Sequence, residues 1–153
     1  MLRIREGSVY HLKDEFYDMM TDHGIICLPA SKGRCPLYCC HIDKPAALLW
    51  MIPIVANIRK YKPIHDKHVI RYGHCFSLVL GMFGDREVVY KLQDMFPVKK
   101  HHIQCAHTSK GKIVPVDQPL RKIIRHCYEE VKQLTDSGIE CTFTDINAIL
   151  NII

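Results

Sequence analysis

Residues 50–61 read WMIPIVANIRKY, an apolar run that passes without a spacer into a cationic segment. The apolar part predicts a β-strand in the core, because short runs of apolar and β-branched residues are typical of buried strands. Five Lys or Arg residues and a single Asp follow between positions 59 and 74. We therefore expect a strand that fixes the backbone and presents positive charges at its end, where a ligand can reach them.

The cationic segment also carries histidines and tyrosines. Its polar and aromatic side chains include Arg59, Lys60, Tyr61, Lys62, His65, Lys67, His68, Arg71, Tyr72 and His74. Cations interleaved with aromatic rings suit phosphates and the faces of unpaired bases, so we predict single-stranded RNA as the ligand. One alternative is that Lys62, Lys67 and Arg71 form an ordinary solvated face. Another is that Tyr61 packs on the sheet.

Two further groups of basic residues lie outside this segment. One contains Lys99, Lys100, Lys110 and Lys112, and the other contains Arg121, Lys122 and Arg125. The formal net charge of +5 and the pI near 8.8 fit a polyanionic partner. Three separate groups exceed what one active-site groove needs, so we expect an assembly of several protein and RNA copies.

Length and cysteine content bound the class of protein. A chain of 153 residues predicts one domain, residues 1–153, with a core of its own. The eight cysteines follow a charged N-terminus that lacks a secretory signal, which predicts reduced thiols and a cytoplasmic protein. No apolar run approaches the roughly 20 residues of a membrane-spanning helix, so we expect no membrane association.

The cysteines and histidines raise the question of zinc. Cys35, Cys39, Cys40 and His41 are close in sequence. No C-x-x-C pair occurs, and Cys39 and Cys40 would point to opposite faces of a strand. We therefore expect no metal site and no cofactor.

The hydrophobic pattern predicts an α+β fold with a twisted antiparallel sheet that forms a small barrel. The N-terminal part is expected to form a first strand up to Val9, a short helix through Leu12 and Phe16, a short apolar stretch at 25–28 and a loop at 30–33. Two hairpins follow, at 36–42 with 46–54 and at 77–83 with 88–93, with a partly helical excursion at 66–73 between them. The C-terminal part is expected to form short strands at 103–107 and 113–116, a long helix from Leu120 to Leu134 and a final helix capped by Thr144. This is one long helix with two or more short ones.

Three segments, taken in their order, resemble the toxins of bacterial type III toxin–antitoxin systems, the ToxN, AbiQ and CptN group, and CptN-like members most closely. They are GRCP at 33–36, LLWMIPIVANIRKYK at 48–62 and YKLQDMFPVKKHHI at 90–103. The resemblance implies a barrel-like fold similar to the MazF and Kid toxins. It also implies a metal-independent endoribonuclease that is inhibited by a pseudoknotted RNA antitoxin, which it cuts from a precursor.

The resemblance assigns roles to particular positions. It implies that Arg34 faces the scissile phosphate at the start of the second strand. Relatives usually carry Ser or Thr where this chain has Val55 and Ala56, and a basic residue where it has Asn57. Either Ala56 is a substitution introduced for Ser, or this branch is catalytically impaired, or it uses Arg59, Lys60 or a histidine instead.

Cleavage without a metal requires cations at the phosphate, a base for the 2′-hydroxyl and an acid for the leaving oxygen. Arg34 is the first candidate for the phosphate because its forked donors match it, and Lys60 or Arg59 is the second. His65 and His68 are candidates for the base and the acid, because histidine titrates near neutral pH.

Further positions are expected to contact RNA without taking part in the chemistry. Tyr61 could stack on a base, and Gln93 could bind a base edge, although Gln93 could instead form a cap or turn. A catalytically silent RNA-binding protein is the alternative function, and it would bind RNA with a steep salt dependence but leave it whole. A DNA-binding regulator is the weakest hypothesis, because we find no helix-turn-helix with a basic second helix.

Overall fold

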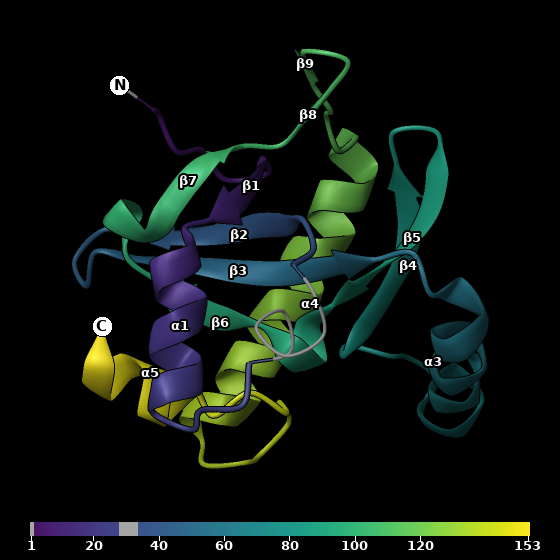
Figure 1. The fold of residues 1–153 in the computed structure, drawn as a ribbon. Coiled ribbons are helices and arrows are strands. Elements are labelled where there is room, and N and C mark those ends of the chain that lie inside the picture. The colour runs from purple at the N-terminus through teal and green to yellow at the C-terminus, as the bar shows by residue number, and fades with distance from the viewer. Residues whose placement is uncertain (1, 28–33) are drawn as a thin grey trace.

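The apolar run forms β3 (Leu48–Val55), the central strand of a seven-stranded, antiparallel sheet (Figure 1). In this computed structural model, residues 2–27 and 34–153 are described. The other elements are β1 (Val9–Leu12), α1 (Asp14–Asp22), β2 (Leu37–Asp43), α3 (Ile58–Tyr72), β4 (Leu78–Phe83), β5 (Arg86–Lys91), the 3-10 helix η1 (Leu92–Asp94), β6 (Phe96–Val98), the 3-10 helix η2 (Lys100–His102), β7 (Ile103–Ala106), β8 (Thr108–Ser109), β9 (Lys112–Ile113), α4 (Gln118–Asp136) and α5 (Ile146–Ile152).

β3 has three neighbours because two strands share one of its sides. β2 pairs with almost its whole length, whereas β6 pairs with its beginning and β5 with its end. The sheet runs in the order β4-β5-β3-β2-β1-β7. Within the described residues, β4 and β7 each have a single neighbour. The α+β class is therefore confirmed, but the described strands form an open sheet and not the closed barrel that we expected.

β3 is apolar throughout because both of its faces are covered. Trp50, Ile52 and Ile54 belong to a cluster with residues of α4. Leu49 and Met51 belong to a second cluster with residues of α1 and α5. Alternate side chains of a strand point to opposite faces, so a strand between two layers of helices has no polar face.

Most of the expected elements are present. Both hairpins are confirmed, and the turn of the second contains Gly84 at a φ of +64°. The long helix α4 starts where the Asp117 side chain accepts a hydrogen bond from the Leu120 amide at 2.9 Å. Within α4, Leu120 and Ile124 are buried, whereas Ile123 is 53% exposed.

Other expectations are corrected. The polar excursion is a helix that begins at Ile58, not near Asp66. Asp145, and not Thr144, caps α5 by accepting a hydrogen bond from the Ala148 amide at 3.0 Å. Of the strand expected at 113–116, only Ile113 lies in a strand, which is β9 of the short hairpin β8–β9. Residues 25–27 of the apolar stretch have no regular secondary structure, and position 28 and the loop at 30–33 lie outside the described residues.

Cys39 and Cys40 lie in different core clusters, as the strand pattern predicts. Among residues 2–27 and 34–153, no group of three or more His, Cys, Asp or Glu side chains is arranged to hold a metal ion. None of the described helices combines the length and the apolar character required to cross a bilayer.

Candidate nucleic-acid interface

The cationic segment forms α3, which leaves the end of β3 and stands at the edge of the molecule (Figure 1). Tyr61, His65, His68 and Tyr72 share one stripe of this helix, because they are spaced by four, three and four residues. Tyr61 is only 8% exposed, whereas Tyr72 is 56% exposed. The stripe therefore faces the body of the protein at the start of α3 and becomes open to solvent towards its end.

Tyr61 attaches α3 to the sheet. Its ring packs in a small cluster with Leu78 and Val89 of the two hairpin strands. This position agrees with the alternative that Tyr61 packs on the sheet. A ring buried in this way offers no face on which a base could stack. Tyr72 is the exposed tyrosine of the segment.

The solvent-exposed surface of α3 beside this stripe is positively charged. Arg59, Lys60, Lys67 and Arg71 are exposed, and none of them forms an ion pair with an acidic side chain in the described part of the chain. The Arg71 guanidinium lies 5.3 Å from the centre of the Tyr72 ring. These four residues, which we call the α3 cations, are available to phosphate groups.

Asp66 organises the middle of the helix. Its Oδ2 lies 2.7 Å from Lys62 Nζ, and its Oδ1 lies 3.1 Å from His65 Nδ1. The hydrogen bond from Lys62, followed by that from His65, holds the pKa of Asp66 below its ordinary value. Lys62 is thus partly neutralised. Because a carboxylate only accepts, His65 Nδ1 carries the proton in this contact, which leaves Nε2 of the neutral ring as an acceptor.

A buried ion pair lies beneath α3 and was not anticipated. Lys91 Nζ lies 2.7 Å from Asp94 Oδ2, with side chains 4% and 1% exposed. Lys91 Nζ also lies 4.5 Å from the centre of the Tyr61 ring. Burial disfavours the charged amine, but hydrogen bonds with Asp94 and Tyr61 raise the pKa of Lys91 above its ordinary value. The pair supports the anchor of α3; its signal in the sequence was a Lys and an Asp three residues apart in an apolar context.

Arg34 and Ala56 lie at the paired ends of β2 and β3. The Ile54 amide donates to the Pro36 carbonyl at 2.9 Å, and the same register continued outwards places Arg34 opposite Ala56. The Arg34 guanidinium, however, donates to Asp14 of α1 and lies 4.8 Å from the centre of the Tyr17 ring. Arg34 is therefore directed at α1 in this arrangement.

The last residue of β3 and the two residues that follow it show a gradient of exposure. Val55 is half-buried, whereas Ala56 and Asn57 are exposed at the start of α3. These two exposed positions join the strand end to the α3 cations, and neither supplies a hydroxyl or a charge.

The other basic groups lie elsewhere. Lys99 Nζ donates to the Ala46 carbonyl at 3.2 Å, and Lys100 is exposed on η2. Lys110 and Lys112 are exposed on the β8–β9 hairpin, which lies at the top of the view in Figure 1, away from α3 at the lower right. The predicted RNA contacts therefore do not form one continuous surface.

Two of the three residues in the third basic group are engaged by the rest of the protein. Arg125 forms ion pairs with Glu6 at 3.1 Å and with Glu129 at 3.0 Å. The Arg121 side chain lies against Gly7 and donates to the Glu6 carbonyl at 3.5 Å. These arginines tie α4 to the N-terminal segment.

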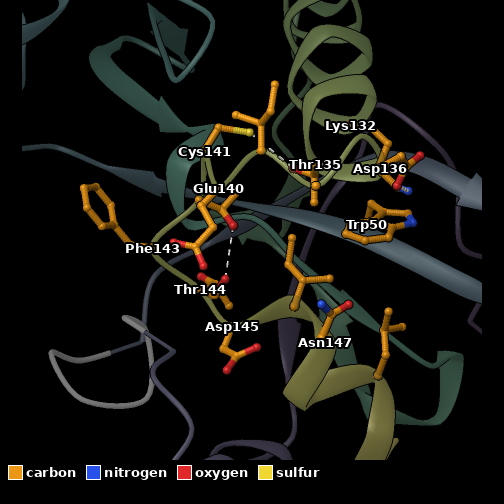
Figure 2. A pocket seen from close by; sticks show the side chains of 15 residues that line it. Trp50, Lys132, Thr135, Asp136, Glu140, Cys141, Phe143, Thr144, Asp145 and Asn147 are labelled. Carbon is orange, nitrogen blue, oxygen red and sulfur yellow. Dashed lines mark hydrogen bonds and ion pairs between the residues drawn. The ribbon is translucent and has the colours of Figure 1, made fainter.

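A pocket of about 660 Å³ lies at the end of α4, and none of the predicted site residues lines it (Figure 2). Its polar wall includes Asp136, Glu140 and Asp145. The Lys132 ammonium lies 2.6 Å from Asp136 and 5.1 Å from the centre of the Trp50 ring. Three carboxylates against one ammonium make this pocket unsuited to a polyanion.

The sequence was also compared with known proteins. No protein-family model matches the chain. No curated protein matches it either. The function is therefore argued from the residues and their geometry.

Proposed function

We propose that this chain is a metal-independent endoribonuclease that binds and cuts single-stranded RNA along α3. The observation that carries the proposal is the pairing of two features on one helix. The α3 cations are exposed, and His65 and His68 lie about one turn apart on the stripe beside them. Cations bind phosphates, and neighbouring histidines can supply a base and an acid.

His65 has the arrangement of a general base. Asp66 accepts its Nδ1 proton, so Nε2 can take the proton of a ribose 2′-hydroxyl. The 2′-oxygen attacks the adjacent phosphorus, and the bond from phosphorus to the 5′-oxygen breaks. His68, whose Cβ is about 5–6 Å from that of His65 at this spacing, donates a proton to the leaving oxygen. The products are a 2′,3′-cyclic phosphate and a 5′-hydroxyl.

Lys60 and Arg59, at the start of α3, are the cations nearest in sequence to the exposed Ala56 and Asn57. Positive charge placed before the reaction begins stabilises the charge that develops on the phosphate oxygens. Arg34 joins this set if its contact with Asp14 opens, since the register brings its backbone opposite Ala56.

The biological part of the proposal rests on the resemblance to type III toxins. It comprises a toxin that is silenced by a pseudoknotted RNA, an assembly with several protein and RNA copies, and a cytoplasmic location. The separate groups at Lys99–Lys100 and on the β8–β9 hairpin would serve additional RNA contacts. The relation to the barrel of MazF-like toxins also belongs here: β3 with three neighbouring strands fits a strongly bent sheet.

A catalytically silent RNA-binding protein is the second candidate. The exposed Ala56, which has no hydroxyl, and the engagement of Arg34 by Asp14 favour it. Such a protein would use the α3 cations in the same way but leave the RNA whole.

Substitution of the histidines separates the two candidates. Under the first, His65→Asn and His68→Asn each lower the cleavage rate by about 10²-fold or more without weakening RNA binding. His126→Asn, at an exposed position on α4, is the matched control and retains the rate. Unchanged cleavage by both α3 variants would refute the assignment, and binding without cleavage by the parent chain would favour the silent protein.

Binding itself is tested by salt. Four phosphate contacts predict that the logarithm of affinity falls with the logarithm of salt concentration with a slope of about −3. Lys67→Ala should reduce this slope by about 0.7. Arg125→Ala, which removes an arginine already paired with two glutamates, should not change it.

A further inference from the structure

A second pocket lies between the open end of α3 and α4. It has a volume of about 310 Å³, near the lower end of the roughly 300–1,000 Å³ of small-molecule sites. Its lining includes His68, Tyr72, His74, Phe76, Gln93 and Phe143. Two aromatic rings at this pocket, Tyr72 and Phe143, are 56% and 68% exposed. Exposed rings at the mouth of a pocket leave their faces available to a planar ligand.

Two other rings of the pocket lining stack on one another. The His74 and Phe76 ring centres are 4.1 Å apart with an angle of 24° between the planes. No acidic residue lines the pocket within the described part of the chain, and Lys67 and Arg71 are exposed on the adjoining helix. An aromatic hollow beside cations suits a flat ring that is attached to phosphates.

Gln93 adds a polar group to this surface. Its backbone is fixed on both sides, because its amide donates to the Ser77 carbonyl at 3.0 Å and its carbonyl accepts from the Phe143 amide at 2.7 Å. The second bond also holds Phe143, which belongs to the lining of both pockets and whose ring points away from Asp136 and Asp145 in Figure 2. The side-chain amide of Gln93 forms no hydrogen bond with another described residue. It therefore keeps donors and an acceptor for the edge of a base.

We propose that this pocket is a nucleobase subsite, in which one unpaired base of the bound RNA stacks on both Tyr72 and Phe143 and is read by the Gln93 amide. The inference rests on the proposed RNA function and deepens it. His68 links the two, since it lies on the catalytic stripe and also lines the pocket. The helical rise puts His68 about 16 Å from Asn57, so the base that is read lies a few nucleotides from the start of α3.

The test uses the full chain, a fluorescent RNA of ten nucleotides and an abasic oligomer of the same length and charge. Parent protein should bind the base-bearing RNA more tightly. Phe143→Ala and Tyr72→Ala should each weaken that binding by about tenfold or more, and should leave binding of the abasic oligomer unchanged. Ile139→Ala is the matched control, because Ile139 is 52% exposed in the same loop but does not line this pocket.

Gln93→Ala tests the reading of the base. It should narrow the differences in affinity among oligomers of A, C, G and U while the mean affinity changes little. Equal affinity of the parent protein for base-bearing and abasic RNA, or equal behaviour of Phe143→Ala and Ile139→Ala, would overturn the subsite but leave the RNA function standing. Absence of binding to both oligomers would refute the RNA function itself. Tighter binding of an apolar peptide, lost in Phe143→Ala, would assign the pocket to a protein partner and overturn the subsite.

Discussion

His102 predicts a loss of stability in mild acid. Its side chain is 9% exposed, and its Nδ1 accepts a hydrogen bond from the Lys99 amide at 3.0 Å. Burial, and then the positive charges of His101, Lys13 and Lys99, lower the pKa of His102 from 6.5 to about 4. Protonation would also remove the acceptor of the Lys99 hydrogen bond.

The lowered pKa determines the sign and size of the effect. Between the two pKa values the unfolded chain binds more protons than the folded protein, so stability is complete above pH 6.5 and is lost as the pH falls towards 4. For this shift, the free energy of unfolding should decrease by about 2 kcal/mol between pH 7 and pH 5.

Urea denaturation at several pH values measures this contribution. His102→Asn keeps an acceptor for the Lys99 amide but does not titrate, so the difference between parent and variant isolates His102. The parent should lose about 2 kcal/mol more than the variant between pH 7 and pH 5. His23→Asn, at an exposed position after α1, controls for the loss of a histidine as such. Parallel curves for the parent and His102→Asn would refute the reasoning.

Two further substitutions test the packing around the site. Gly81→Ala would place a Cβ 2.7 Å from the methyl groups of the buried Leu120, so it should destabilise the protein by about 1–3 kcal/mol. The double variant with Leu120→Ala should lose less stability than the sum of the losses in the two single variants. A melting temperature of Gly81→Ala equal to that of the parent would contradict this contact. Asp94→Asn leaves the Lys91 ammonium buried without its counter-charge and should cost about 3–5 kcal/mol in urea denaturation, whereas the double change Lys91→Met with Asp94→Leu should recover most of that loss.

Much of the fold could be predicted from the sequence because its signals are local. The hairpin around Gly84 and the long helix after Asp117 depend on turn and cap residues that act within a few positions. Whether the sheet closes into a barrel could not be predicted from local signals. Whether a sheet closes depends on contacts between distant strands, and β3 divides one of its sides between β5 and β6.

For the candidate site, the sequence indicated which residue types are present but not which side chains contact one another. The cations of α3 could be predicted from the high density of basic residues in the segment. The partner of Arg34 could not, because it is Asp14, twenty residues earlier in the chain. The stripe of Tyr61, His65, His68 and Tyr72 was present in the spacing, yet a search for apolar periodicity passes over histidine. Ion pairs made across the fold, such as Arg125 with Glu6, depend on tertiary structure and leave no local pattern.

The chemistry of the RNA ends tests the central claim most directly. The chain and its Ala56→Ser variant are incubated with labelled single-stranded RNA in excess EDTA, and the ends of the fragments are mapped. We predict 2′,3′-cyclic phosphate and 5′-hydroxyl ends from at least one of the two forms, with equal cutting by both if the α3 histidines and cations suffice. Intact RNA with both forms, or fragments that carry 5′-phosphate ends, would contradict a metal-independent ribonuclease.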